Sequence, residues 1–152
     1  MIIKFNEIKF ENRLETRWDI LLRVVGDLTI DVGTSRVLQE PNFPLVELAV
    51  ALANWIAAVS DSGPEFSFVS MESVEGALVT FTLVAPGVWA IEHGVSEASS
   101  DVPRVTTNEL RHSVILFFKE LHARLLSMTD ILLLIDDFSV RTHIKSLIDQ
   151  TH

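Results

Sequence analysis

The hydrophobic pattern of this chain changes at Glu40-Pro41-Asn42-Phe43-Pro44-Leu45-Val46-Glu47-Leu48-Ala49, and that change decides the fold. Pro44 suits the first turn of a helix, because the N–H that proline lacks would have no partner there. From residue 45 to residue 59 apolar side chains recur at helical spacing, which predicts a helix with a broad apolar face. These apolar positions are Leu45, Leu48, Leu52, Trp55, Ile56 and Val59.

Upstream of this helix, apolar and polar residues alternate in the way that is typical of half-buried strands. We expect an edge strand at 3–10, a strand at 16–24, a tight turn at Gly26-Asp27, and a hairpin strand at 28–32. After a turn at 33–35, a short third strand is expected at 36–39.

A second group of strands follows the helix. Phe66 and Phe68 share a face, residues 77–83 alternate, and after a turn at 85–87 the residues 88–93 return as a strand. Residues 94–103 are expected to form a loop. Thr106 and Glu109 then match a capping box at the start of a second helix, which continues to about residue 125.

The carboxyl-terminal part is expected to add helix. Residues 131–138 are apolar enough for a strand or a helix, and a 3.6-residue period favours the helix. The order of strands, helix, strands and helices predicts one α+β domain over residues 1–152. We expect an antiparallel sheet of five to six strands with about three helices packed mainly on one face.

Charge is the most uneven property of the sequence. The net charge is -9, and no Lys or Arg occurs between Val37 and Pro103. That segment contains nine acidic residues, whereas the other twelve are balanced by the twelve Lys and Arg. Such a field attracts basic proteins and repels phosphates, so nucleic-acid binding is not expected.

The composition predicts a cytoplasmic location for the chain. It has 48% hydrophobic residues and no cysteine, which fits a folded protein in a reducing compartment. Lys4 and Glu7 interrupt any signal-peptide apolar region, and the apolar run at 44–59 is too short to span a bilayer. We therefore expect no membrane association.

No motif indicates an enzyme, a cofactor or a metal site. His112 and His122 lie ten residues apart with Lys119 between them, and a cation there opposes a metal ion. Asp136 and Asp137 are adjacent, so on a helix they diverge by about 100° and cannot face one substrate. Nucleophile-elbow and phosphate-binding glycine motifs are both absent from the sequence.

Two resemblances accompany these observations. The pattern E-P-x-F-P-x-x-E-L-A at residues 40–49, followed by Trp55, resembles the opening of a helix in small bacterial domains of unassigned role. In size, acidity and lack of cysteine, the chain also resembles immunity proteins of bacterial toxin systems such as contact-dependent growth inhibition. The second likeness is one of type and implies no particular functional residue.

The favoured hypothesis is therefore a cytoplasmic binding protein that neutralises a basic partner by covering it, as an immunity protein covers a toxin active site. Two other interpretations stay open for the predicted contact residues: acids that serve only solubility, and tryptophans that belong to the core. The alternative function is a homo-oligomeric accessory domain, including a homodimer, built on the apolar run at 131–135. The predicted contact residues are Asp61, Glu65, Glu72, Glu75, Trp89, Glu92, Glu97 and Asp101.

Overall fold

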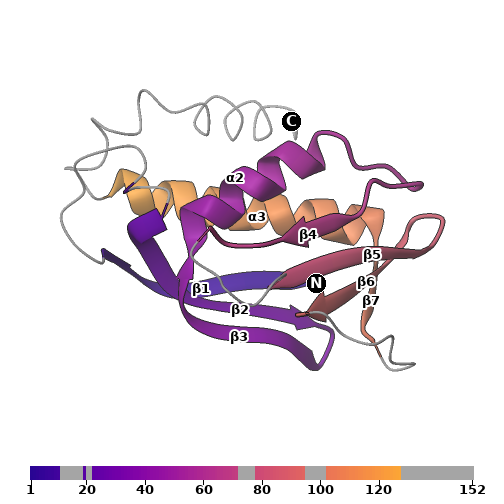
Figure 1. Ribbon diagram of the computed structural model, residues 1–152, viewed down its shortest axis with the longest axis horizontal. Helices are drawn as coiled ribbons and strands as arrows, with labels where there is room; N and C mark the ends of the chain where they lie inside the picture. Colours follow the sequence, from indigo (N-terminus) through magenta and orange to yellow (C-terminus); the bar gives the residue numbers. More distant parts are fainter. Residues whose placement is uncertain (11–18, 20–21, 72–77, 95–101, 128–152) are drawn as a thin grey trace.

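The computed structural model describes residues 1–10, 19, 22–71, 78–94 and 102–127 (Figure 1). Seven strands and two helices have defined bounds within these residues. In chain order they are β1 (Ile2–Phe10), β2 (Val24–Val32), β3 (Ser35–Pro44), α2 (Leu45–Ile56), β4 (Phe66–Phe68), β5 (Val79–Ala85), β6 (Val88–His93), β7 (Arg104–Thr106) and α3 (Thr107–Leu126).

The first three strands form an antiparallel sheet in the order β1-β2-β3. Ile3 lies opposite Ile30, and Ile30 lies opposite Leu38, so three buried side chains form one row on the core face. The register of β1 against β2 shifts between Phe5 and Ile8. This irregularity bends an edge strand, as β-bulges do.

The other four strands form a second antiparallel sheet in the order β4-β5-β6-β7. Phe81 of β5 lies opposite Phe66 on one side and Ile91 on the other, and all three side chains are buried. The turn between β5 and β6 contains Gly87 at a φ of 71°, a conformation that glycine adopts without strain.

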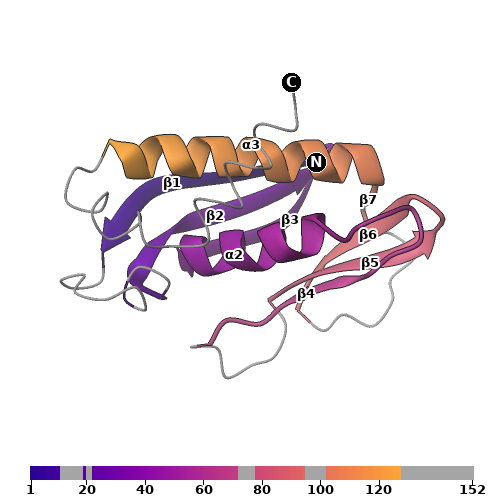
Figure 2. The same ribbon diagram turned by 90° about the horizontal axis from the view of Figure 1, so that it is seen from above.

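Both helices cover the same face of the first sheet, with α3 over β1 and α2 over β2 (Figure 1). Figure 2 shows the two sheets displaced from one another along the length of α3, which contacts β1 and β7. Trp55 of α2 packs on Phe66 and Trp89, with ring centroids 5.4 Å and 5.6 Å apart. Buried residues of both sheets and both helices therefore share one hydrophobic core.

The structure confirms the α+β class and differs from the expected single sheet of five to six strands. Seven described strands divide into two sheets, and β7 lies just after the predicted loop at 94–103. Alternation predicts strands that overlap β1 to β6 but not β7, and it carries no signal for where one sheet ends. The helices expected beyond residue 130, including the apolar run at 131–135, lie outside the described residues.

The tight turn predicted at Gly26-Asp27 is wrong, because both residues lie inside β2. A Cβ atom at Gly26 would stand 2.8 Å from the carbonyl oxygen of Glu7 and 2.8 Å from Cδ1 of Leu45. Glycine is thus required here by the close approach of a neighbouring strand and a helix, which is the usual reason for glycine inside a strand.

The strand predicted at 16–24 is also wrong where it can be compared. Residues 19, 22 and 23 are helical, and Asp19 forms an ion pair of 3.1 Å with Arg23, four positions later. An i, i+4 pair of opposite charge supports a helical turn and has no counterpart in a strand. The strand β2 begins only at Val24. Neither of the helices with defined bounds, α2 and α3, combines the length and the apolarity that a bilayer crossing requires.

Candidate functional site

Five of the nine acidic residues in the segment without Lys or Arg belong to the described structure. They are Glu40, Glu47, Asp61, Glu65 and Glu92. The other four, Glu72, Glu75, Glu97 and Asp101, lie outside the described residues, so their predicted role in binding stays a prediction.

Asp61 and Glu65 are brought together at the β5–β6 hairpin. The carbonyl oxygen of Asp61 accepts a hydrogen bond of 2.7 Å from the N–H of Gly87, and its carboxylate lies against that glycine. Oε1 of Glu65 accepts a hydrogen bond of 3.0 Å from the N–H of Leu83. Both side chains are exposed, so the hairpin carries two carboxylates at the surface.

Glu92 lies elsewhere on the same sheet. It pairs with Thr80 across β5 and β6, and its neighbour Ile91 is buried, so the half-buried Glu92 faces away from the core. Four positions along β6 separate it from Val88 at the hairpin. The three predicted acids that can be placed therefore lie on or beside the four-stranded sheet but do not form a single compact cluster.

Trp89, predicted as an exposed contact, is not on the surface. Its relative exposure is 0%, and its Nε1–H donates a hydrogen bond of 3.0 Å to Oγ1 of Thr107. The indole also packs edge-on against Trp55. The prediction of an exposed hot spot is wrong because the inward face of β6 meets α2 and α3, and the core interpretation of this residue is confirmed.

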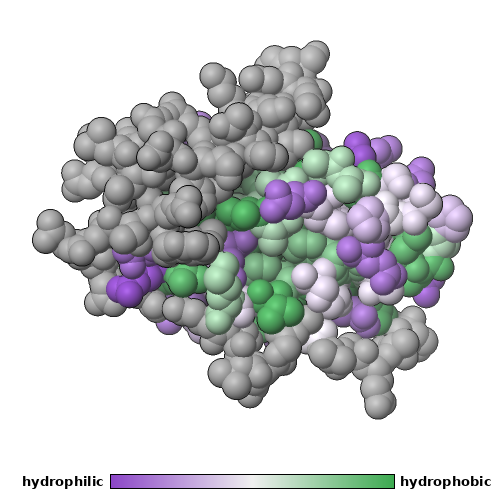
Figure 3. All heavy atoms as spheres, turned by 45° about the horizontal axis from the view of Figure 1, so that its top comes forward, coloured by the Kyte–Doolittle hydropathy of each residue, from purple (hydrophilic) through white to green (hydrophobic). Residues whose placement is uncertain are grey.

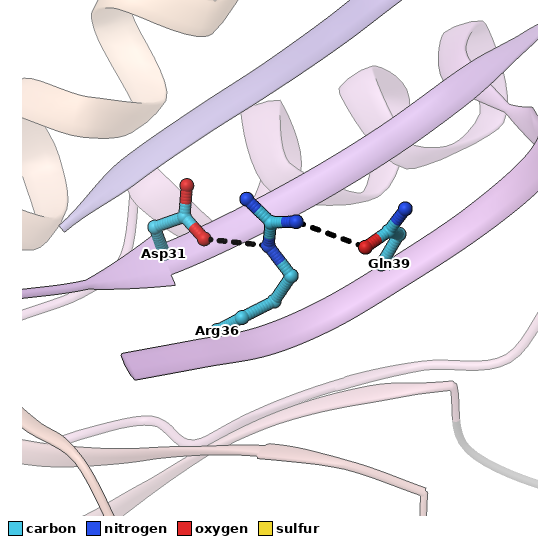
Figure 4. A network of polar contacts seen from close by, with 3 residues as sticks. All are labelled: Asp31, Arg36 and Gln39. Carbon is cyan, nitrogen blue, oxygen red and sulfur yellow. Dashed lines mark hydrogen bonds and ion pairs between the residues drawn. The ribbon is translucent and has the colours of Figure 1, made fainter. Parts of the chain in front are cut away.

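Ion pairs between acids and Lys or Arg occur in only part of the described molecule. In the three-stranded sheet Asp31 accepts a hydrogen bond of 3.0 Å from Nε of Arg36, which also donates to Gln39 (Figure 4). Asp27 pairs with Lys9 in the same sheet. Asp19 with Arg23, and Glu120 with Arg124, complete the acids that pair with Lys or Arg among the described residues.

The four-stranded sheet differs in this respect. Among described residues, no Lys or Arg forms an ion pair with Asp61, Glu65 or Glu92. The remaining acid–base contact is that of Glu40 with His93, at 3.4 Å, which joins β3 of one sheet to β6 of the other. Among the residues that the structure describes, the predicted contact acids that can be placed thus form no ion pair with Lys or Arg.

Comparison with known families places this chain. A family model described as a domain of unknown function, DUF7878, matches residues 1–127. The chain belongs to the DUF7878 family. No curated protein and no solved structure gives a significant match. The DUF7878 match reaches one residue beyond α3, and so it includes every strand and helix with defined bounds.

One residue of the DUF7878 domain has a role that the sequence did not reveal. Glu47, in the first turn of α2, has a relative exposure of 6%. Its Oε2 accepts a hydrogen bond of 2.8 Å from the hydroxyl of Ser70, and its Oε1 accepts one of 2.8 Å from the N–H of Met71. A buried carboxylate needs such partners. The only signal in the sequence was an acidic residue within a largely apolar helix, and that position alone does not reveal its burial.

Glu47 acts together with Phe43 of the same motif. The Phe43 ring lies 5.5 Å from that of Phe68, the last residue of β4. Two residues from the E-P-x-F-P-x-x-E-L-A pattern therefore contact the end of β4 and the residues that follow it. This pattern thus has a structural role in this DUF7878 domain.

Catalytic and metal chemistry find no support in the described residues. His112 is exposed on α3, and His122 is half-buried there. Within the part of the chain that the structure describes, no three His, Asp or Glu side chains gather as a metal site would require.

Proposed function

We propose that this chain is a cytoplasmic binding protein that neutralises a basic protein partner, in the manner of an immunity protein that covers a toxin active site. Its carboxylates would meet Lys and Arg side chains around the partner's functional surface. Opposite charges of this kind accelerate association and favour one orientation of the complex.

The observation that supports the proposal is the contrast in charge pairing. The four described acids that form an ion pair with Lys or Arg, namely Asp19, Asp27, Asp31 and Glu120, all lie outside the segment from Val37 to Pro103. Glu7 and Glu109, which also lie outside that segment, form no such pair among the described residues. Asp61, Glu65 and Glu92 have no such neighbour among the described residues, and the segment from Val37 to Pro103 contains no Lys or Arg at all. A carboxylate that lacks an internal cation retains its full attraction for an external one.

The proposal is tested by titrating the full chain with each purified, catalytically inactive basic protein encoded beside its own gene. The test variant is Asp61→Asn/Glu65→Gln/Glu92→Gln, in which each amide keeps an oxygen that can accept a hydrogen bond. We expect Kd to rise about tenfold, since rim charges contribute modestly and additively.

The matched control is Asp27→Asn/Asp31→Asn/Glu120→Gln, which removes the same three charges from acids that are already paired. We expect it to bind nearly as the unchanged chain does. Binding should weaken as NaCl is raised from about 50 mM to about 300 mM, because salt screens exposed charges. Equal losses in the two variants would reduce the effect to net charge, and an absence of binding to every basic neighbour would overturn the proposal.

A further inference from the structure

Val69 and Met71 are the two most exposed large apolar side chains of the described structure. Their relative exposures are 51% and 62%. They follow β4, which is the edge strand of the four-stranded sheet. Figure 3 shows apolar side chains that reach the surface among polar ones on the face that it draws. Single exposed apolar residues are ordinary on protein surfaces, whereas two neighbouring ones that the structure holds outward, such as Val69 and Met71, need an explanation.

Ser70, the residue between them, is held in place by a hydrogen bond to a buried side chain. Ser70 has a relative exposure of 6%, and its hydroxyl donates to the buried carboxylate of Glu47. The N–H of Met71 donates to the other oxygen of that carboxylate. Side chains alternate along extended chain, so pulling Ser70 inward turns Val69 and Met71 outward.

The burial of Glu47 has a free-energy cost that the contacts of this segment do not fully offset. Burying a carboxylate is unfavourable, and two hydrogen bonds offset that penalty only in part. Phe43 adds a second anchor one position before Val69, by packing on Phe68. The result is a segment held by contacts at Phe68, Ser70 and Met71 whose outward side chains are both apolar, which is a property of a contact surface rather than of a solubilising loop.

We infer that Val69 and Met71 form the apolar centre of the surface that binds the basic partner. This inference rests on the proposed function and adds to it the position of the contact. Phe68 pairs with Val79, and Val79 pairs with His93, so Val69 lies at the end of the sheet that carries Glu92. An apolar centre beside acidic groups matches a partner with an apolar side chain flanked by Lys or Arg.

The charge of this region favours a basic protein over a second copy of the chain as the binding partner. A second copy would bring Glu92 and the rest of a segment without Lys or Arg against its own equivalent. Like charges placed opposite one another oppose association, whereas a basic surface would be attracted. The geometry therefore points to a basic protein at Val69 and Met71.

The test uses the full chain with Val69→Ser/Met71→Ser and the basic protein bound by the unchanged chain in the titration above. We expect Kd to rise about tenfold or more, because two half-exposed apolar side chains lose the burial that binding gives them. The matched control is Ile2→Ser/Leu116→Ser, whose apolar side chains are both 50% exposed, on β1 and α3. It should bind within about twofold of the unchanged chain.

Each outcome has a distinct meaning. If the unchanged chain binds and the Val69→Ser/Met71→Ser variant binds equally well, the contact lies elsewhere and only this inference fails. If the unchanged chain binds none of the basic proteins, the proposed function fails and the inference fails with it. If light scattering shows a dimer that Val69→Ser/Met71→Ser converts to a monomer, the occupant is a second copy and the inference is overturned. Unaltered melting temperatures establish that the variants are folded.

Discussion

The carboxylate of Glu47 and the hydroxyl of Ser70 lie 2.8 Å apart although 23 positions separate them in the sequence. Glu47 belongs to the first turn of α2, where the helix dipole favours a negative charge. Ser70 belongs to the segment that leaves β4. The contact therefore ties the second sheet to the helix that covers the first.

Replacing Glu47 tests this tie. Glu47→Ala removes the carboxylate that accepts hydrogen bonds from the Ser70 hydroxyl and from the N–H of Met71. We expect the free energy of unfolding to fall by about 2–4 kcal/mol, measured by urea denaturation. Glu47→Gln retains one acceptor oxygen and should lose less. Faster amide exchange at Met71 in Glu47→Ala, with little change at Phe81, would localise the effect, and unaltered exchange at Met71 would contradict it.

Gly26→Ala tests the close approach of three elements. The added methyl group would meet the carbonyl oxygen of Glu7 and Cδ1 of Leu45 at 2.8 Å each. Because one of these atoms is backbone, β1 must shift, and we expect a loss of about 1–3 kcal/mol in a thermal or urea melt. Thr29→Ala, on a half-buried position of the same strand, provides the comparison. Equal stability of Gly26→Ala and the unchanged chain would show that β1 does not approach this closely.

Trp89→Phe tests the burial of the indole. The change leaves Oγ1 of the buried Thr107 without the Nε1–H donor and opens a small void between β6 and α3. We expect a destabilisation of about 1–3 kcal/mol with no change in affinity for the basic partner beyond that caused by unfolding. A folded variant that binds the basic partner less tightly would instead indicate that Trp89 contributes to the contact surface.

The capping box of α3 predicts a dependence of stability on pH. The N–H and the hydroxyl of Thr106 both donate to the Glu109 carboxylate, and these hydrogen bonds lower the pKa of Glu109 below its ordinary value. A lowered folded pKa means that this stabilisation is present above the unfolded pKa of about 4.3 and is lost as the pH falls through the folded value. Glu109→Gln should therefore lose less stability than the unchanged chain between about pH 6 and about pH 3.

Thr106→Ala supplies the companion measurement. It removes the hydroxyl that caps the N–H of Glu109, and we expect a loss of about 1 kcal/mol at neutral pH. Thr82→Ala, on β5, is a comparison that leaves the cap intact. A pH profile of Glu109→Gln that parallels that of the unchanged chain would exclude the carboxylate as the titrating group.

Local patterns predicted the elements whose cause is local. The 3.6-residue period gave α2, the Thr106–Glu109 spacing gave the start of α3, and alternation gave the strand at 28–32. Gly26 was misread because a glycine required by close packing and a glycine required by a turn look alike in one sequence. Asp19 and Arg23 were misread because alternating residues also fit an i, i+4 pair.

The candidate site was less predictable, since it depends on which strands become neighbours. Asp61 and Glu65 meet at a hairpin only because Gly87 and Leu83 fold back beside them. Trp89 was misplaced because alternation shows which side of a strand is apolar but not what covers it. The hydrogen bonds of Glu47 could not be foreseen, because their donors, Ser70 and Met71, lie more than twenty positions away in the segment that follows β4.

The apolar interior shared by both sheets has a consequence for how this molecule denatures. Trp55 touches Phe66, Phe81 and Trp89 from α2, while Phe117 of α3 touches Phe5 of β1. Removing either sheet would expose the side chains that stabilise the other. Melting should accordingly be all-or-none over residues 1–127, with calorimetric and van't Hoff enthalpies in agreement.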